Sequence, residues 1–267
     1  MIKENYHTHT ELCYHASGKI EDYVLAAINA GYESLGMSDH GPLQNAGFVR
    51  MNLDEFYNIY IPEFKYCKEK YKDKINLYVG LELEYLEGRL DYYKKIKEDL
   101  DYLILGPHYY SKYEQNNHTS VYNVNTKETL EMYVNMIEEA LDTKLFDILA
   151  HPDIMLCGYY GYNDDLDMAI RRICRACIKN NVILEFNVAG YIKGCKYFEV
   201  GNKRVYDYMY PNKHFFSIVS EFKDLKVILS LDAHNPNQIV KEKKEAENLI
   251  NELKIKLVSN PFGNKND

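Results

Sequence analysis

The chain has 267 residues, is 46% hydrophobic and 27% charged, and carries a formal net charge of −8. This is an ordinary globular composition, and the negative charge argues against non-specific binding to nucleic acid or to an anionic membrane. The sequence has no apolar run of membrane-spanning length and no apolar signal segment near its N-terminus. We therefore expect a cytoplasmic protein with neither nucleic acid nor membrane as a partner. The sequence does not indicate an oligomeric state.

Short apolar runs, many of them β-branched, alternate along the chain with longer stretches of helical period, and these predict strands and helices. The predicted strands lie near Ile2–Tyr6, Ser34–Met37, Ile75–Leu83, Tyr102–Leu105, Phe146–Ala150, Val182–Phe186 and Val227–Leu231. The predicted helices are Ile20–Tyr32, Asn52–Tyr71, Leu86–Leu100, a helix from near Asn125 whose apolar stripe ends at Leu145, Asn163–Asn180, a helix beginning at Pro211, and Pro236–Leu257. The expected N-caps include Asn52, paired with Glu55 in a capping box, Asn163 or Asp164, and Asn235.

Strands that alternate with helices imply a parallel sheet, and strands that are apolar nearly throughout are covered on both faces. About seven such units follow one another, which predicts a closed or nearly closed seven-unit barrel. Because α/β barrels of this length routinely form one domain, we expect residues 1–267 to form a single domain.

Polar residues gather at one end of this predicted barrel, the carboxyl end of the strands, where the active sites of β/α barrels lie. Seven of the nine histidines occupy or closely follow strand ends; only His118 and His214 do not. In strand order, the residues are His7, His9 and His15; Asp39 and His40; Glu82 and Glu84; His108; His151; Glu185 and Asn187; and Asp232 and His234. Structural histidines would not select strand ends, so we interpret these residues as a metal site.

A ligand set of imidazoles and carboxylates suits Zn, Mn, Fe or Co. A catalytic zinc takes about three protein ligands and keeps an open position for water. Nine candidate ligands, one of them bridging, would therefore supply three ions. Metal-bound water loses its proton near neutral pH and becomes a nucleophile. The set predicts metal-assisted hydrolysis, with a phosphate ester as the favoured substrate.

The six cysteines are scattered and are expected to be free thiols. Cys174 and Cys177 form a C-x-x-C pair that could indicate zinc or redox chemistry. They follow the core spacing of a predicted helix, however, so we expect both to be small buried hydrophobic residues.

Seven short motifs resemble the polymerase-and-histidinol-phosphatase (PHP) superfamily. They are HTH (7–9), SDH (38–40), GLE (80–82), GPH (106–108), AHPD (150–153), LEFN (184–187) and SLDAH (230–234), and they span nearly the whole chain. The stretches GMSDHGPL, YVGLELEY, DYLILGPHYY and LEFNVAG resemble the stand-alone histidinol-phosphate phosphatases in particular. The resemblance implies a distorted (β/α)7 barrel, a trinuclear centre of divalent Zn, Mn or Fe ions, and hydrolysis of L-histidinol phosphate in histidine biosynthesis by a metal-activated hydroxide.

The resemblance also implies a role for each ligand. The first metal would be held by His7, His9, Glu82 and Asp232, the second by Glu82, His108 and His151, and the third by His15, His40 and His234. Glu82, Asp232 and His234 are the residues expected to take part in catalysis.

The sequence departs from the resemblance where the substrate phosphate would bind. Histidinol phosphatases place arginines after the HPD element and after LEFN-x-x-G, but here only Lys193 and Lys196 are basic. Lysine binds phosphate as a point charge and cannot form the bidentate contact of arginine. Lys193, His118 and Asn187 are the candidate substrate contacts. Two alternatives therefore stay open: a phosphoesterase acting on phosphotyrosine, a nucleotide or a sugar phosphate, and a non-catalytic PHP-like module that keeps its metals for stability.

Overall fold

Seven parallel strands form the centre of the molecule. The computed structural model describes residues 3–43, 49–110, 119–239 and 244–263. The sheet order is β1-β2-β3-β4-β5-β6-β9, and every neighbouring pair is parallel. The strands are β1 (Glu4–Asn5), β2 (Ser34–Met37), β3 (Asn76–Leu83), β4 (Tyr102–Leu105), β5 (Ile148–Leu149), β6 (Ile183–Asn187) and β9 (Val227–Ser230). All seven strands predicted from the sequence are confirmed.

The two outer strands of this sheet approach each other just beyond their carboxyl ends. Thr8 and Ala233 form an isolated parallel bridge, and the amide of His9 donates to the carbonyl of Ala233 at 2.9 Å. The sheet is therefore a nearly closed barrel. The residues that close it lie beside the histidines of the first motif and the Asp232–His234 segment.

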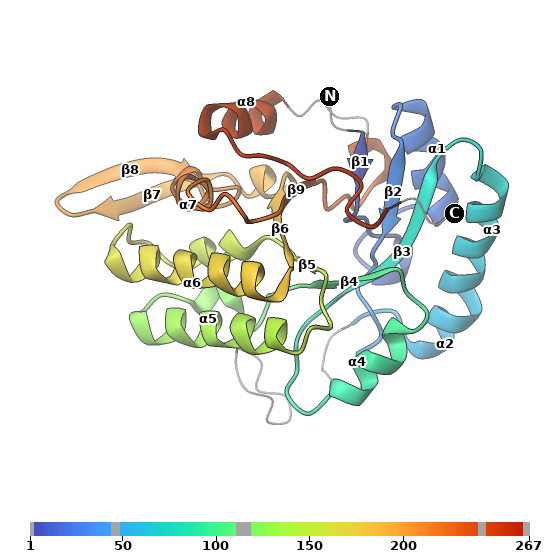
Figure 1. The fold of residues 1–267 in the computed structure, drawn as a ribbon, viewed down its shortest axis with the longest axis horizontal. Coiled ribbons are helices and arrows are strands. Elements are labelled where there is room, and N and C mark those ends of the chain that lie inside the picture. Colours follow the sequence, from blue (N-terminus) through green and yellow to red (C-terminus); the bar gives the residue numbers. More distant parts are fainter. Residues whose placement is uncertain (1–2, 44–48, 111–118, 240–243, 264–267) are drawn as a thin grey trace.

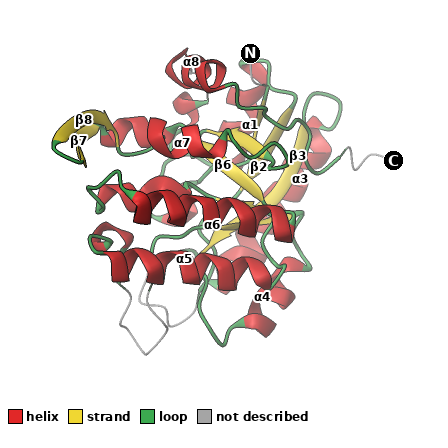
Figure 2. Ribbon diagram, turned by 60° about the vertical axis from the view of Figure 1, so that its left-hand side comes forward, coloured by secondary structure: helices red, strands yellow, loops and turns green. Residues whose placement is uncertain are grey.

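Helices surround the sheet (Figures 1 and 2). They are α1 (Ile20–Asn29), α2 (Leu53–Glu55), a π-helical turn (Phe56–Tyr60), α3 (Ile61–Tyr71), α4 (Leu90–Lys97), α5 (Lys127–Asp142), α6 (Asp164–Asn180), α7 (Lys213–Val219) and α8 (Lys244–Leu253). Two predicted caps are confirmed, because Asn52 forms a capping box with Glu55 and Asn163 accepts from the amide of Leu166. No helix in the described part of the chain is long and apolar enough to cross a membrane.

Three of the helix predictions were wrong at their starts. The helix expected over Leu86–Leu100 begins only at Leu90, because a turn with Gly88 at φ 83° precedes it. The helix expected from Pro211 begins at Lys213, because the side chain of Asn212 caps it. The helix expected from Pro236 is a short 3-10 turn, Pro236–Gln238, capped by Asn235 as predicted. Residues 240–243 lie outside the described residues, and α8 follows from Lys244 to Leu253.

A β-hairpin was missing from the sequence prediction. Strands β7 (Cys195–Val200) and β8 (Lys203–Tyr208) pair antiparallel and project from the body of the molecule (Figure 1). Phe198 anchors the hairpin, because it is fully buried and stacks on Tyr162 at a ring distance of 4.5 Å. The sequence did contain a signal for this hairpin, because the two residues Gly201 and Asn202 separate two runs in which polar and apolar residues alternate.

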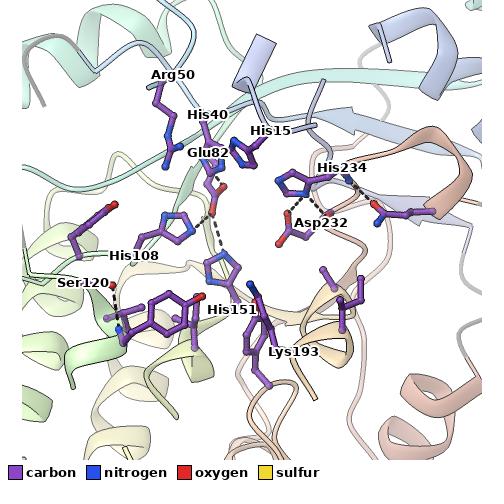
Figure 3. A pocket seen from close by; sticks show the side chains of 18 residues that line it. His15, His40, Arg50, Glu82, His108, Ser120, His151, Lys193, Asp232 and His234 are labelled. Carbon is purple, nitrogen blue, oxygen red and sulfur yellow. Dashed lines mark hydrogen bonds and ion pairs between the residues drawn. The ribbon is translucent and has the colours of Figure 1, made fainter. Parts of the chain in front are cut away.

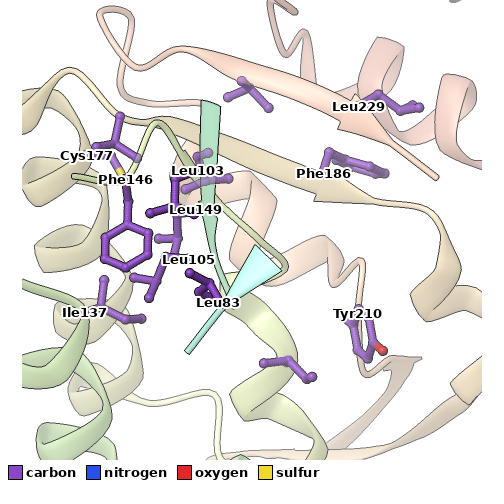
Figure 4. Packing of buried hydrophobic residues seen from close by; sticks show 14 of the residues in the cluster. Leu83, Leu103, Leu105, Ile137, Phe146, Leu149, Cys177, Phe186, Tyr210 and Leu229 are labelled. Atoms are coloured by element: carbon purple, nitrogen blue, oxygen red, sulfur yellow. The ribbon is translucent and has the colours of Figure 1, made fainter. Parts of the chain in front are cut away.

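The apolar core has two parts. The larger lies between the strands and the surrounding helices, where leucines of β3, β4 and β5 meet residues such as Ile137 and Cys177 (Figure 4). Cys174 and Cys177 are both fully buried there, as predicted. The smaller part draws one or two side chains from most strands, and Phe262 packs against it: Tyr6, Tyr78, Tyr102, Ile104, Ile148, Ala150, Ile183 and Ile228. We take this second cluster to be the filling of the barrel.

The inner face of the barrel changes from apolar to polar along several of its strands. Side chains two residues apart share a face of a strand, so Tyr78 and Glu82 face the same side of β3. In the same way, Ile183 of β6 is followed on its own face by Glu185, and Ile228 of β9 precedes Asp232 by four residues. The amino end of the barrel is therefore filled by hydrophobic side chains, and its carboxyl end by ionisable ones.

Candidate metal centre

Glu82 lies at the centre of the ionisable cluster and is almost completely buried. Its Oε2 is 3.1 Å from His40 Nδ1, 3.3 Å from His7 Nε2 and 3.5 Å from His9 Nε2. Its Oε1 faces a different pair, with His151 Nε2 at 3.2 Å and His108 Nε2 at 3.5 Å. The two oxygens of one carboxylate thus face two separate groups of imidazoles, of which Figure 3 shows His40, His108 and His151 around Glu82.

Asp232 lies on the other side of the His7 and His9 pair. Its Oδ1 is 3.1 Å from His9 Nε2, 3.5 Å from His7 Nε2 and 3.4 Å from His234 Nδ1. The ring of His234 in turn lies 4.3 Å from that of His9 and 5.0 Å from that of His15. All nine sequence-predicted ligands therefore belong to one continuous cluster.

Three of the compact ligand groups in the described residues contain only predicted ligands. They are His7–His9–Glu82, Glu82–His108–His151 and His9–His40–His234. His15 is grouped instead with His234 and Cys13, and a further group joins Cys13 to His9 and Asp39. The predicted third set of His15, His40 and His234 is thus close together but is not itself one of the groups. Cys13 and Asp39 are neighbours of the cluster that were not predicted as ligands.

Several imidazole nitrogens in this cluster have no hydrogen-bond partner although they are buried. They are His7 Nε2, both ring nitrogens of His9, His40 Nδ1 and His151 Nδ1. A buried polar atom without a partner is costly. Buried nitrogens beside buried carboxylates are the donor set that divalent transition metals take, so these clusters suit divalent metal ions.

In four histidines of the cluster, the Nδ1 atom lies within hydrogen-bond distance of an oxygen atom. His7 Nδ1 lies 2.7 Å from Glu185 Oε1, and His108 Nδ1 lies 3.1 Å from Glu84 Oε1. The Nδ1 atoms of His15 and His234 lie 2.8 Å and 3.0 Å from the backbone carbonyls of Cys13 and Asp232. Since ionised carboxylates and carbonyls only accept, each Nδ1 carries a proton, and Nε2 is the ring nitrogen left to bind a metal.

Both central carboxylates are ionised despite their burial. Burial by itself would raise the pKa of Glu82, but the nearby His7, His108 and His40 outweigh it and hold that pKa well below its usual range. The pKa of Asp232 is likewise held well below its usual range, because His7 and His9 outweigh the effect of burial. The cluster therefore offers negative charge for bound cations.

Local backbone geometry is unusual at two of the candidate ligands. His151 has φ 25° and Asp232 has φ 48°, both in the left-handed region that non-glycine residues rarely adopt. Such strain is concentrated at functional sites, where the surrounding structure enforces it. Gly106 has a related role, since a Cβ there would lie 2.6 Å from Glu82 Oε1 and 2.8 Å from His108 Cε1. The glycine of the GPH motif makes room for the central carboxylate.

A cavity of about 440 Å³ opens over this cluster of nine candidate metal ligands, which we call the metal cluster. Glu82, His108, His151, Asp232 and His234 contribute to its walls, together with Tyr109, Tyr122 and Tyr210. The cavity is therefore large enough for a small organic substrate in contact with the cluster.

The predicted substrate contacts have different outcomes. Lys193 lines the cavity; it is the last residue of a 3-10 turn, Ala189–Lys193, that follows β6. Asn187 does not line it; its amide donates to Glu185 at 3.0 Å and to Asp232 at 3.1 Å, which favours a positioning role. His118 lies outside the described residues. Lys196 points elsewhere, because its Nζ donates to the carbonyls of Cys157 and Tyr159.

The sequence prediction missed one basic residue of the cavity wall, Arg50. It lies in the segment between β2 and α2 and lines the cavity beside His15 and His40. The family resemblance places phosphate-binding arginines only in the segments after β5 and β6. No motif in the sequence ties Arg50 to the cavity, although it follows one of the strand ends that supply ligands.

A model of the PHP domain family matches residues 5–189, a range that includes seven of the nine candidate ligands. The chain belongs to the PHP domain family. The resemblance based on the seven motifs is thus confirmed, and so is the PHP-type barrel.

The PHP chain is similar to two curated relatives over most of its length. A protein of Deinococcus radiodurans named "probable histidinol-phosphatase" is 26% identical, covering 87% of this chain and 86% of the relative. A protein of Schizosaccharomyces pombe with the same name is 22% identical, covering 87% of this chain and 81% of the relative.

Two solved structures resemble the PHP barrel. A candidate histidinol phosphatase of Listeria monocytogenes has a TM-score of 0.72 and 20% identity, covering 91% of this chain and 99% of that one. The histidinol phosphate phosphatase of Lactococcus lactis, solved with zinc, L-histidinol and phosphate, has a TM-score of 0.67 and 19% identity, covering 96% of this chain and 95% of that one. These likenesses establish a common fold.

Proposed function

We propose that this PHP chain is a metal-dependent phosphomonoesterase that hydrolyses L-histidinol phosphate to L-histidinol and phosphate. The observation that carries the proposal is the position of Glu82, whose two oxygens face two histidine groups at the wall of a cavity. The full-length relatives named histidinol-phosphatase support the choice of substrate. The proposal includes one PHP domain over residues 1–267 that acts in the cytoplasm, in histidine biosynthesis, on a small phosphorylated substrate.

Three ions are part of this proposal, with Zn, Mn and Fe as the candidates. The first would be held by His7, His9, Glu82 and Asp232, the second by Glu82, His108 and His151, and the third by His15, His40 and His234. When bound, such ions would supply Lewis acidity that activates water and neutralises phosphoryl oxygens.

The side chains of the chain itself have separate tasks in the proposed reaction. Glu82 and Asp232 stay ionised and hold the positive charge of the site in place. Glu185 orients the imidazole of His7, and Asn187 ties Glu185 to Asp232. His234 lines the cavity and is 28% exposed, so it lies within reach of a bound substrate. We therefore propose Glu82, Asp232 and His234 as the catalytic residues.

A substrate panel tests the proposed function. Protein reconstituted with Zn or Mn would be assayed on histidinol phosphate, phosphotyrosine, a nucleoside monophosphate and a sugar phosphate. We expect kcat/KM for histidinol phosphate to exceed the others by about 100-fold, the selectivity that a few specific contacts provide. A flat profile would favour a general phosphoesterase, and no turnover with any metal would favour the non-catalytic alternative. Elemental analysis of the same samples should find up to three ions per chain.

A further inference from the structure

Arg50 is held in a defined position at the wall of the cavity. Its side chain is only 16% exposed, and its Nη2 donates to Glu84 Oε1 at 3.2 Å. Its Nη1 donates to the carbonyl of Val49 at 3.4 Å. In Figure 3, the guanidinium lies on the side of His40 and His108, away from Lys193.

Glu84 connects this arginine to the metal cluster. Glu84 is buried, and its Oε1 also receives a hydrogen bond from His108 Nδ1 at 3.1 Å. His108 Nε2 is the atom that faces Glu82 at 3.5 Å. One carboxylate oxygen therefore positions both a candidate metal ligand and the guanidinium, so that the two keep a fixed relation to each other.

With metal ions bound, the charges on this wall of the cavity would attract an anion. Metal ions in the cluster would repel a guanidinium on the same wall, and the single charge of Glu84 is shared with His108. An anion between the metals and Arg50 would be attracted by both. A guanidinium has five N–H donors in a planar fork that matches phosphate bidentately, so its bond to Glu84 is compatible with a second, bidentate partner.

Lys193 is the other Lys or Arg side chain among the described residues that line the cavity. It reaches the cavity from the opposite side, near His151 (Figure 3). As an ammonium it offers a point charge without the planar fork. The two cations therefore differ in what they can contribute, and Arg50 is the one able to fix the orientation of a phosphoryl group.

We propose that Arg50 binds the phosphoryl oxygens of the substrate and that Glu84 is the residue that positions it. The inference rests on the proposed function, because it takes a phosphate monoester as the ligand. It assigns to the segment between β2 and α2 the bidentate contact that the segments after β5 and β6 cannot provide.

The test compares Arg50→Lys and Arg50→Ala with Arg204→Lys. Arg204 is a matched control, since it pairs with Glu199 at the same 3.2 Å but lies on the exposed hairpin. The measurements are metal content, kcat and KM for histidinol phosphate, and calorimetric binding of inorganic phosphate to the metal-loaded protein. In both Arg50 variants we expect KM and the phosphate Kd to rise about 10- to 100-fold, the effect of losing a charge-assisted hydrogen bond. Metal content should not change.

The role of Glu84 needs a readout that a purely structural residue would not affect. Glu84→Gln should raise the phosphate Kd in the same way as Arg50→Lys, and the double variant should be no worse than either single one, because both act through the same contact. Glu199→Gln is the matched control. Additive effects in the double variant would overturn the positioning role.

The outcomes separate this inference from the proposed function. Unchanged phosphate binding in both Arg50 variants would overturn the inference, and so would loss of metal in the conservative Arg50→Lys variant. If the wild type hydrolyses no phosphomonoester, the proposed function fails. Phosphate binding that still depends on Arg50 would in that case support an anion site with a different use.

Discussion

The geometry around Glu82 has a simple electrostatic reason. Ions in two-metal sites lie roughly 3.5–4 Å apart, where two dications repel each other strongly in a low-dielectric pocket. A carboxylate that gives one oxygen to each ion offsets that repulsion and sets the spacing. Glu82 has one oxygen near the His7 and His9 pair and the other near the His108 and His151 pair, which is the arrangement that this role requires.

Glu82→Gln should therefore lose at least one metal ion and nearly all turnover, because the side chain keeps its shape but loses its charge. We expect activity to fall by at least about 100-fold. Loss of a residue that only supports a metal ligand typically lowers activity by up to about 100-fold. Metal analysis and phosphate release measure the effect, and circular dichroism should show an intact fold. Glu87→Gln, on the exposed surface, is the control. Full metal content with normal turnover would refute the bridging role.

Metal binding should release protons near neutral pH. In the metal-free protein, burial alone would lower the pKa of His7, but Glu185, Asp232 and Glu82 outweigh it and raise that pKa well above 6.5. His7 thus keeps its proton at pH 7 until a metal displaces it, and metal affinity rises with pH up to the pKa of His7. Calorimetry in two buffers of different protonation enthalpy measures the release. Glu185→Gln should reduce it, and a buffer-independent enthalpy would contradict the prediction.

The turn that follows β4 places Glu82 by leaving space for it. A methyl group at position 106 would lie 2.6 Å from Glu82 Oε1, closer than real Cβ contacts allow. Gly106→Ala should therefore displace Glu82 or His108 and lower metal content and activity, while the secondary structure stays intact. Gly88→Ala, where nothing lies within 4 Å of the added Cβ, is a control for glycine substitution, although its positive φ adds backbone strain. Equal metal content in Gly106→Ala and wild type would show that the cluster tolerates the methyl group.

Helix α6 provides the opposite case, in which a suggestive pattern is only structural. Cys174 and Cys177 are fully buried, and burial raises the pKa of both thiols. Replacing either by serine puts a hydroxyl in an apolar site, which costs about 1–3 kcal/mol of folding stability. Denaturant unfolding should show this loss with metal content unchanged. Cys195→Ser, at a half-buried position on the hairpin, should be milder. Metal loss in the α6 variants would revive a metal role for the C-x-x-C pair.

The strand elements could be predicted from the sequence because burial on both faces leaves apolar runs of distinct length, as in Ser34–Met37 and Tyr102–Leu105. The clustering of the candidate ligands could be predicted because parallel strands bring their carboxyl ends together. The position of Arg50 at the cavity could not be predicted, since it follows no strand end directly and belongs to no motif. Nor could the grouping of Cys13 with His15 and His234, which depends on the local turn after β1.

At the scale of the whole molecule, the metal cluster lies where the barrel closes. His7 and His9 follow the first strand of the sheet, and Asp232 and His234 follow the last, next to the Thr8–Ala233 bridge. Ions held by both groups would join the two edges of the sheet. Binding energy at the site is then also folding energy, because an unfolded chain presents no such site.

Removing the metals should therefore lower the melting temperature. With free metal at 100 times its Kd, the native state gains about 2.7 kcal/mol per site, and a chelator removes that gain. Thermal unfolding with and without chelator measures the difference, and re-addition of Zn or Mn should restore it. In Glu82→Gln the difference should shrink. A melting temperature that does not depend on metal would show that the barrel closes without help from the cluster.

The position of this junction also bears on how the protein is made. Among the candidate ligands, His7 and His9 leave the ribosome first, and His234 leaves only after more than 220 further residues. Until then, the growing chain carries His7, His9 and Glu82 without the aspartate and histidine that complete their surroundings. We expect a nascent chain to hold metal poorly and to acquire its full complement only once the last strand has docked against the first. Activity would thereby be reserved for chains that extend past β9.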